Sequence, residues 1–247
     1  MKGTKEQVKK ANREFYDIVG YRYEEIDGRR SDELLLYTMD QLGRLSKESG
    51  SEAILDLGCG SGFITKSARP YFKKRYALDI SSEILKTIED IDVVKINSDM
   101  DTIPIKDNEL NCVAAFAVLH HCYSYEKMIP EIARILKPGG AFYSDHDMDS
   151  FFFHRYRILL RLYRKIRNAS QSYRSQFSQL TEEMYHCTEF HEEGIQTEHV
   201  EELLKACFSK VDVQYHWFGL TPLSDKVFGK RSYKKGYAPL VKIIAVK

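Results

Sequence analysis

Three glycines at alternate positions, Gly58, Gly60 and Gly62, follow a short apolar run that ends in Asp56. Glycine lets a backbone turn sharply and approach a ligand closely, because it has no Cβ. Ser61 is expected to cap a helix that begins here, and a helix N-terminus offers free N–H groups and the positive end of the helix dipole. These residues predict a pocket for a nucleotide-like ligand with a negatively charged group.

The spacing of the glycines and the next acidic residue narrow the ligand. A dinucleotide-binding loop, Gly-x-Gly-x-x-Gly, has its third glycine where this chain has Phe63. Asp79 stands at the end of the next apolar run. At that position its carboxylate can accept hydrogen bonds from two ribose hydroxyls. The stretch of sequence between Asp56 and Asp79 is long enough to hold a helix and a strand.

Strands and helices alternate along most of the chain, which implies βαβ units, a mostly parallel sheet and ligands at the carboxyl ends of its strands. Strands are expected at 53–57, 75–79, 92–96, 111–116, 141–144, 211–217 and 240–246. The helix expected at 31–46 has Ser31 as its N-cap, and the helix at 126–136 is expected to end at residues 137–140, Lys-Pro-Gly-Gly.

Residues 52–145 resemble the class I S-adenosylmethionine-dependent methyltransferases, in particular the small-molecule type 11 group. The resemblance is carried by five stretches in family order: ILDLGCGSG (54–62), ALDIS (77–81), SDMDTIP (98–104), VLHH (118–121) and RILKPGG (134–140). It implies a Rossmann-like, doubly wound α/β fold with a mostly parallel seven-stranded sheet and an antiparallel last strand. It also implies S-adenosylmethionine as the cofactor.

The resemblance assigns the methionine end of the cofactor to the first strand, the glycine loop and the fourth strand. Gly58, Cys59 and Gly60 should approach the methionine part, and Asp56 should order the loop and the amino group. Ala117, just past the fourth strand, should lie near the amino-acid end.

The ribose and adenine are assigned to the ends of the second and third strands. Asp79 should bind the ribose hydroxyls and Ile80 should pack on adenine. Asp99 should accept a hydrogen bond from the adenine amine, with Met100 beside the ring. A carboxylate for a diol and an apolar slot for a planar base are physically suitable partners.

Methyl transfer from a sulfonium needs alignment and exclusion of water, and a general base only where the acceptor must lose a proton. The candidate catalytic residues are His121 and His146, near strand carboxyl ends. An Asn/Asp-Pro-Pro-aromatic turn, typical of enzymes that methylate exocyclic amines of nucleobases, does not follow the fourth strand.

Four aromatic residues are candidates for contact with the acceptor. Tyr16 and Tyr21 resemble an N-terminal segment that often covers the pocket in this group, and are equally compatible with packing between helices. Phe152 and Tyr156 belong to an aromatic-rich insertion, which suggests a small-molecule acceptor with apolar or aromatic bulk.

The predicted division is a helical lid (1–47), a cofactor-binding core (48–147), a helical cap insertion (148–196) and the C-terminal part of the core sheet (197–247). Residues 151–168 form a helical pattern with an apolar half opposite a basic half, and the segment 182–202 is acidic. The cap helix is expected to pack over the pocket with its basic face in water. Alternatives are an interfacial helix for a membrane or lipid-like substrate, or a surface for an anionic partner such as RNA.

Composition limits the remaining possibilities. The net charge is +1, so nucleic acid is not an expected partner. The other alternative to a small-molecule methyltransferase is a non-catalytic module that binds the cofactor. Five scattered cysteines without a Cys-x-x-Cys pair predict no metal and a reducing cytoplasm. No signal peptide is expected, and no apolar run approaches the roughly 20 residues of a membrane span.

Overall fold

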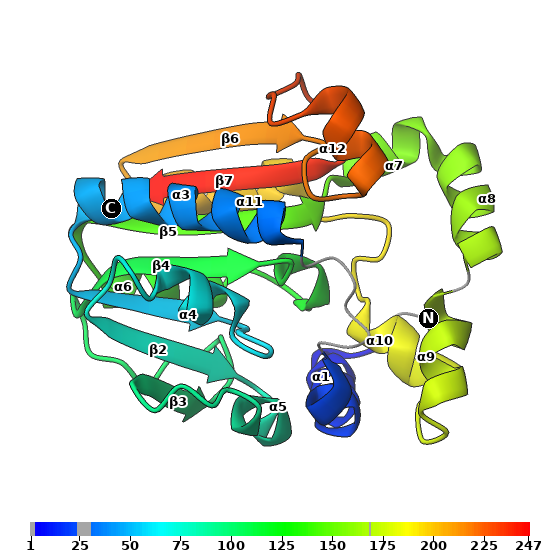
Figure 1. Ribbon diagram of the computed structural model, residues 1–247, viewed down its shortest axis with the longest axis horizontal. Coiled ribbons are helices and arrows are strands. Elements are labelled where there is room, and N and C mark those ends of the chain that lie inside the picture. The colour runs from blue at the N-terminus through cyan, green and yellow to red at the C-terminus, as the bar shows by residue number, and fades with distance from the viewer. Residues whose placement is uncertain (1–2, 24–30, 168) are drawn as a thin grey trace.

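A seven-stranded sheet forms the centre of the computed structural model, which describes residues 3–23, 31–167 and 169–247 (Figure 1). Across the sheet the strands are β3 (Val93–Asn97), β2 (Lys74–Asp79), β1 (Ala53–Leu57), β4 (Leu110–Phe116), β5 (Leu136–Met148), β7 (Leu240–Val246) and β6 (Lys210–His216). Strand β7 runs antiparallel to both of its neighbours, and the other pairs are parallel. The expected mostly parallel sheet with an antiparallel last strand is confirmed.

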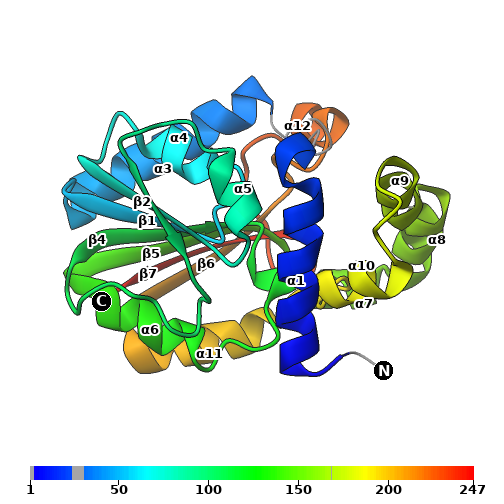
Figure 2. The same ribbon diagram turned by 90° about the horizontal axis from the view of Figure 1, so that it is seen from below.

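Helices cover both faces of the sheet, so its central strands are apolar on both sides. All five residues of β1 are buried. Figure 2 shows one face covered by α3 (Asp32–Ser49), α4 (Phe63–Ala68) and α5 (Ser82–Lys86), and the other by α6 (Met128–Ile135) and α11 (Thr197–Cys207). The strand order reverses between β1 and β4, and the carboxyl ends of strands at such a point form a ligand crevice.

The N-terminal helices take two different positions. Helix α3 is capped by Ser31, as predicted, and its apolar residues join the core beside β1. Helix α1 (Lys5–Val19) lies instead across the carboxyl edge of the sheet (Figure 2) and is followed by the short 3-10 helix η1 (Gly20–Arg22). Residues 24–30, which fall within the predicted lid at 1–47, lie outside the described residues.

The prediction that Ser61 caps a helix is wrong. Gly62, not Ser61, is the N-cap of α4, because this position requires a left-handed backbone, with φ of 89°. The carboxylate of Asp56 supplies the capping acceptor, since its Oδ2 accepts from the backbone N–H of Thr65 at 2.9 Å. Asp56, near the end of β1, therefore caps α4 in place of Ser61.

The helix expected at 126–136 is present as α6, but residues 137–140 take a different form from the predicted terminator. Helix α6 already ends at Ile135, and Leu136 is extended, with φ of −75° and ψ of 139°. Residues 137–140 lie inside β5, where the pairing with β4 shifts register between Leu110 and Cys112. Gly139 is held there because its N–H donates to the carbonyl of Lys247 at 3.0 Å. Strand pairing, rather than helix termination, explains this segment.

The insertion departs most from prediction. The single helix expected at 151–168 is two helices, α7 (Ser150–Arg155) and α8 (Arg157–Arg167), separated at Tyr156. Helices α9 (Ala169–Gln176) and α10 (Glu182–Thr188) follow, and α12 (Pro222–Phe228) lies between the last two strands in sequence. The predicted packing of the apolar half over the pocket is wrong, because the break leaves that side of α8 exposed to solvent.

No helix within the described ranges combines the length and the apolar character that crossing a bilayer would need.

Replacing Phe142 with Ala is expected to lower the free energy of unfolding by about 3–5 kcal/mol, because its ring is fully buried in the central strand β5. Leu36→Ala is the matched control: that side chain is 63% exposed, and its loss should change stability by no more than about 0.5 kcal/mol. Urea unfolding curves measure both values. Equal destabilisation by the two substitutions would contradict this core.

Candidate active site

One pocket at the carboxyl edge of the sheet brings together the residues predicted to bind the cofactor. All nine of them line it: Asp56, Gly58, Cys59, Gly60, Asp79, Ile80, Asp99, Met100 and Ala117. His121, His146 and Tyr16 line the same pocket. Residues separated by up to 130 positions in the chain thus meet where the strand order reverses.

The glycine loop has a backbone conformation that residues other than glycine rarely adopt. Gly58, Gly60 and Gly62 have φ of 66°, 51° and 89°, in the region where a Cβ is disfavoured. The N–H groups of Gly58 and Cys59 donate to the carbonyl of Leu78 at 2.8 and 3.0 Å. A Cβ on Gly58 would also lie 2.7 Å from the side chain of Val118. The loop is therefore tied to β2 and closed against the residues that follow β4.

Asp79 connects this loop to the start of α5. Its Oδ2 accepts from the N–H of Gly60 and its Oδ1 from the N–H of Ser81, both at 3.0 Å. Burial raises the pKa of Asp79 to about 6, although these backbone donors favour the anion. A carboxylate held at the end of β2, in the pocket wall, is a suitable acceptor for a diol.

Ion pairs, which no sequence pattern indicated, join helix α1 to the loop after β3. The ammonium of Lys9 contacts the carboxylate of Asp99 and lies 2.7 Å from Asp101, and Lys5 lies 2.5 Å from Asp101. Burial opposes ionisation of Asp101, but the two lysines hold its pKa below its usual value. The acid predicted to contact adenine is thus already partnered by the helix that covers the pocket.

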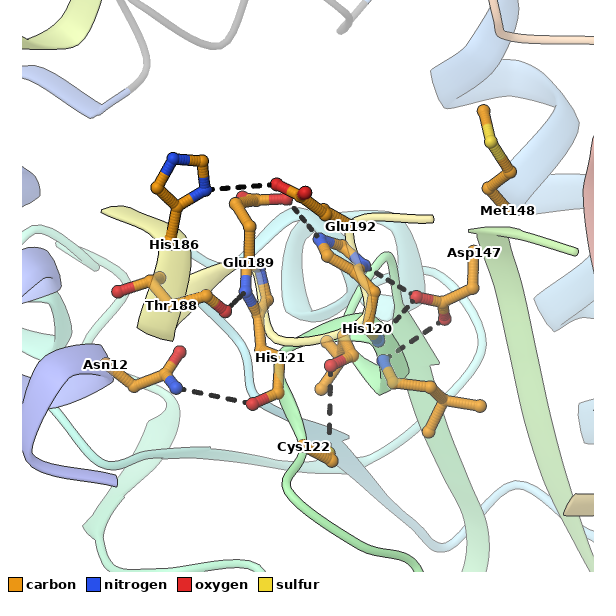
Figure 3. Close-up of polar contacts among 12 residues, drawn as sticks. Asn12, His120, His121, Cys122, Asp147, Met148, His186, Thr188, Glu189 and Glu192 are labelled. Atoms are coloured by element: carbon orange, nitrogen blue, oxygen red, sulfur yellow. Dashed lines mark hydrogen bonds and ion pairs between the residues drawn. The ribbon is translucent and has the colours of Figure 1, made fainter. Parts of the chain in front are cut away.

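The two histidines after β4 have different surroundings, which Figure 3 shows. Nδ1 of His120 lies 2.7 Å from Oδ1 of the buried Asp147. The backbone N–H groups of Leu119 and His120 donate to the same carboxylate. His120 is therefore part of the framework that holds the turn after β4.

His121 faces the pocket with a defined tautomer. Its Nδ1 lies 2.8 Å from the carbonyl of Thr188, which can only accept, so Nδ1 carries the proton (Figure 3). Its Nε2 then accepts from the hydroxyl of Tyr16 at 2.9 Å. Burial, assisted by the neighbouring His120, lowers the pKa of His121 to about 4. At neutral pH this ring is an uncharged base that touches a tyrosine.

Asp145 organises the other wall of the pocket. It is fully buried, and its Oδ1 accepts from the backbone N–H of His146 and from Nε2 of His216, both at 2.7 Å. Its Oδ2 accepts from the hydroxyl of Tyr143 at 2.7 Å. The two imidazoles hold the pKa of Asp145 well below its usual value, against the effect of burial. Tyr143, Asp145 and His146 are close in sequence on β5, but the sequence could not indicate that His216 of β6 joins them.

His146 is the member of this group that reaches the pocket. Its backbone has φ of 71°, a strained conformation for a residue with a side chain, and such strain often marks a functional position. Its ring stacks on Phe116, with centroids 4.3 Å apart. Its Nδ1 lies 3.0 Å from Oδ1 of Asp145, so this carboxylate and the Phe116 ring fix where the imidazole lies.

The aromatic residues predicted to contact the acceptor are separated by the fold. Tyr16 lines the pocket, but Tyr21 is 75% exposed and packs beside Phe177. Phe152 is buried next to Tyr156 and Trp217, and neither Phe152 nor Tyr156 lines the pocket. Other apolar residues, which periodicity alone marks as core, form much of the wall: Val8, Phe15, Leu34, Phe63, Ile64, Phe116, Val118, Leu220 and Leu240.

Comparison with known proteins identifies the central segment. Residues 55–144 match the family described as "Methyltransferase domain". The malonyl-[acyl-carrier protein] O-methyltransferase of Buchnera aphidicola is 34% identical over 90 residues, which cover 36% of this chain and 36% of that protein. The human mitochondrial arginine-hydroxylase NDUFAF5 is 31% identical over 91 residues, covering 36% of this chain and 26% of that protein.

A solved structure extends the likeness in fold to almost the whole chain. An S-adenosylmethionine-dependent methyltransferase of Thermotoga maritima superposes with a TM-score of 0.59 at 15% identity, covering 95% of this chain and 99% of that one. The matches to the two curated relatives span about a third of their length or less.

Residues 55–144 therefore match the methyltransferase-domain family of the type 11 group, and the chain shares the fold of S-adenosylmethionine-dependent methyltransferases. The cofactor of this enzyme class is S-adenosylmethionine, and the pocket fits it. The glycine loop leaves space that a Cβ at Gly58 would invade, and Asp79 presents a buried carboxylate. Apolar side chains beside both can accept a planar base.

Asp79→Ala is expected to weaken binding of S-adenosylhomocysteine at least tenfold, because two hydrogen bonds to a charged acceptor are worth about 1.5–3 kcal/mol each at most. Asp212→Ala, which removes an exposed carboxylate on β6, should leave the affinity unchanged. Titration calorimetry measures both, and thermal unfolding confirms that the variants are folded. Unchanged affinity in Asp79→Ala would overturn this assignment.

Cofactor affinity is also expected to depend on pH in one direction. The pKa of Asp79 in the free protein is about 6, and binding to hydroxyl donors favours its anion. Affinity should therefore be constant above that pKa and fall as the pH drops through it. Calorimetry with S-adenosylhomocysteine between about pH 5 and 8 tests this, and affinity that rises on acidification would contradict it.

Proposed function

We propose that this chain transfers a methyl group from S-adenosylmethionine to a small-molecule acceptor with apolar or aromatic bulk. The observation that carries the proposal is that the cofactor residues, the neutral His121 and the hydroxyl of Tyr16 line one pocket. Its largely apolar wall supports an acceptor with apolar bulk. When bound, the cofactor supplies an electrophilic methyl group on a sulfonium.

The division of labour follows from where the residues lie. The glycine loop, Asp56 and Ala117 are proposed to hold the methionine end, and Asp79 the ribose. Ile80, Asp99 and Met100 are proposed to surround adenine, which would require Asp99 to exchange or share the ammonium of Lys9.

Tyr16 and His121 are proposed to remove a proton from the acceptor. The hydroxyl of Tyr16 donates to Nε2 of His121, so its oxygen can accept a hydrogen bond from an acceptor O–H or N–H. As the acceptor loses its proton to Tyr16, the tyrosine proton passes to the imidazole. The imidazole is unprotonated at pH 7, but its low pKa makes it a weak base and burial also raises the pKa of Tyr16, so the tyrosine proton moves only as the acceptor's proton arrives.

His146 is proposed to contact the acceptor from the opposite wall, in the position fixed by Asp145 and Phe116. Of the lid predicted at 1–47, only α1 is proposed to cover the pocket, because its lysines attach it to the loop after β3 whereas α3 packs in the core. All five cysteines are free thiols, which favours a reducing compartment such as the cytoplasm.

Tyr16→Phe and His121→Ala are each expected to lower turnover by about 10²-fold or more, because they break the proton relay, with cofactor affinity changed only a few-fold. The assay is release of S-adenosylhomocysteine across a panel of ring-bearing alcohols, phenols and amines. Tyr21→Phe, at an exposed site, is the control and should keep full activity.

Two results would contradict parts of this proposal. Full turnover in His121→Ala would remove the base from the mechanism while leaving the transferase. Cofactor binding without turnover of any acceptor would instead favour the non-catalytic binding module.

A further inference from the structure

Helix α8 (Arg157–Arg167) presents its apolar side to solvent. Ile158, Leu159, Leu162 and Tyr163 are 81%, 67%, 56% and 47% exposed. Residues one or four positions apart lie close together on a helix surface, so these four side chains form a continuous stripe along one side of α8. A stripe of this kind on a surface helix normally faces the protein core.

On the side of α8 that faces the protein, the side chain of Arg164 attaches the helix to the body. The guanidinium of Arg164 lies 4.6 Å from the centroid of the Phe153 ring and donates to the carbonyl of Glu192. Phe153 is buried, so this contact fixes how the helix is rotated. The outward direction of the apolar stripe is therefore set by a specific contact.

Cations border the apolar stripe. Arg157, Arg161 and Lys165 are exposed on the flank of α8, and Arg155 stands at the preceding turn. Arg161 has an acidic partner, Glu193, at 2.6 Å. The sequence from 151 to 180 contains no Asp or Glu, so the helix itself offers no compensating charge. An occupant of this surface must accept apolar side chains and carry negative charge beside them.

We propose that α8 docks on the surface of a membrane that contains anionic lipids, with its axis in the plane of the interface. Ile158, Leu159 and Leu162 would enter the acyl boundary, and the arginine and lysine stems would extend to bring their charges to the phosphates. Figures 1 and 2 show α8 at the edge of the molecule farthest from the sheet, where a flat surface can reach it.

Charge favours a lipid surface over a second copy of the chain. Two α8 helices packed through their stripes would bring their basic flanks together, and like charges at close range are unfavourable. An anionic lipid surface satisfies the stripe and the flanks at once, since each cation near it contributes roughly a fivefold factor in binding. The proposal is independent of the methyl acceptor and of catalysis.

The test is flotation of the full chain with vesicles of phosphatidylcholine and phosphatidylglycerol, compared with phosphatidylcholine alone. Binding is expected only to the anionic vesicles and should weaken as salt is added. The double variant Leu159→Gln/Leu162→Gln should bind the anionic vesicles at least roughly tenfold more weakly, because the apolar area that enters the bilayer is lost. Ile91→Gln, a 95% exposed apolar site outside the insertion, is the matched control and should bind like wild type.

The charge requirement is tested with Arg157→Gln/Lys165→Gln, which should reduce vesicle binding, against Lys47→Gln, an exposed lysine on α3. Wild-type protein that ignores anionic vesicles overturns the proposal, as does undiminished binding by the Leu159/Leu162 variant. A wild-type dimer in sedimentation that the same variant converts to a monomer assigns the stripe to self-association. Salt-sensitive RNA binding without vesicle binding assigns the flanks to nucleic acid, and either result overturns membrane docking.

Discussion

The carboxylate of Asp79 fixes the relation between two loops on which the pocket depends. One loop carries the glycines after β1, the other starts α5, and the carboxylate accepts from a backbone N–H of each, those of Gly60 and Ser81. Burial raises its pKa to about 6, so holding the anion in this place costs stability that the backbone donors only partly offset. A ligand that donates hydrogen bonds to the same carboxylate recovers that cost on binding, which couples affinity to order in both loops.

The neighbouring histidines His120 and His121 show how environment assigns different roles to identical side chains. The carboxylate of Asp147 takes up one ring and two backbone N–H groups of the turn, which makes His120 a structural residue. A carbonyl from α10 fixes the tautomer of the other ring, and burial keeps it neutral. The insertion thus reaches the pocket through Tyr173 and Glu189, and through the Thr188 carbonyl on His121, rather than through the aromatic side chains of α7.

The insertion also shows a limit of amphipathic patterns. Periodicity identifies an apolar side on a helix, but it does not say what lies against that side. In α8 the rotation is set by Arg164 on Phe153, so the side that would bury most apolar area faces outward. The contacts of Arg164 with Phe153 and Glu192, and not the apolar pattern, therefore set the rotation of α8.

The sequence by itself determined the strands, which depend on local periodicity, and the glycine loop, which depends on glycine geometry. Its resemblance to a known family implied the antiparallel last strand and the nine residues that gather at the carboxyl edge. The left-handed backbone at Gly58, Gly60 and Gly62 is such a local requirement. Only the tertiary structure decided the cap supplied by Asp56, the ion pairs of Lys9, the group around Asp145 and the outward side of α8. Each of these joins residues from separate elements, and the energy of such a contact depends on distance and burial in three dimensions, which spacing along the chain does not encode.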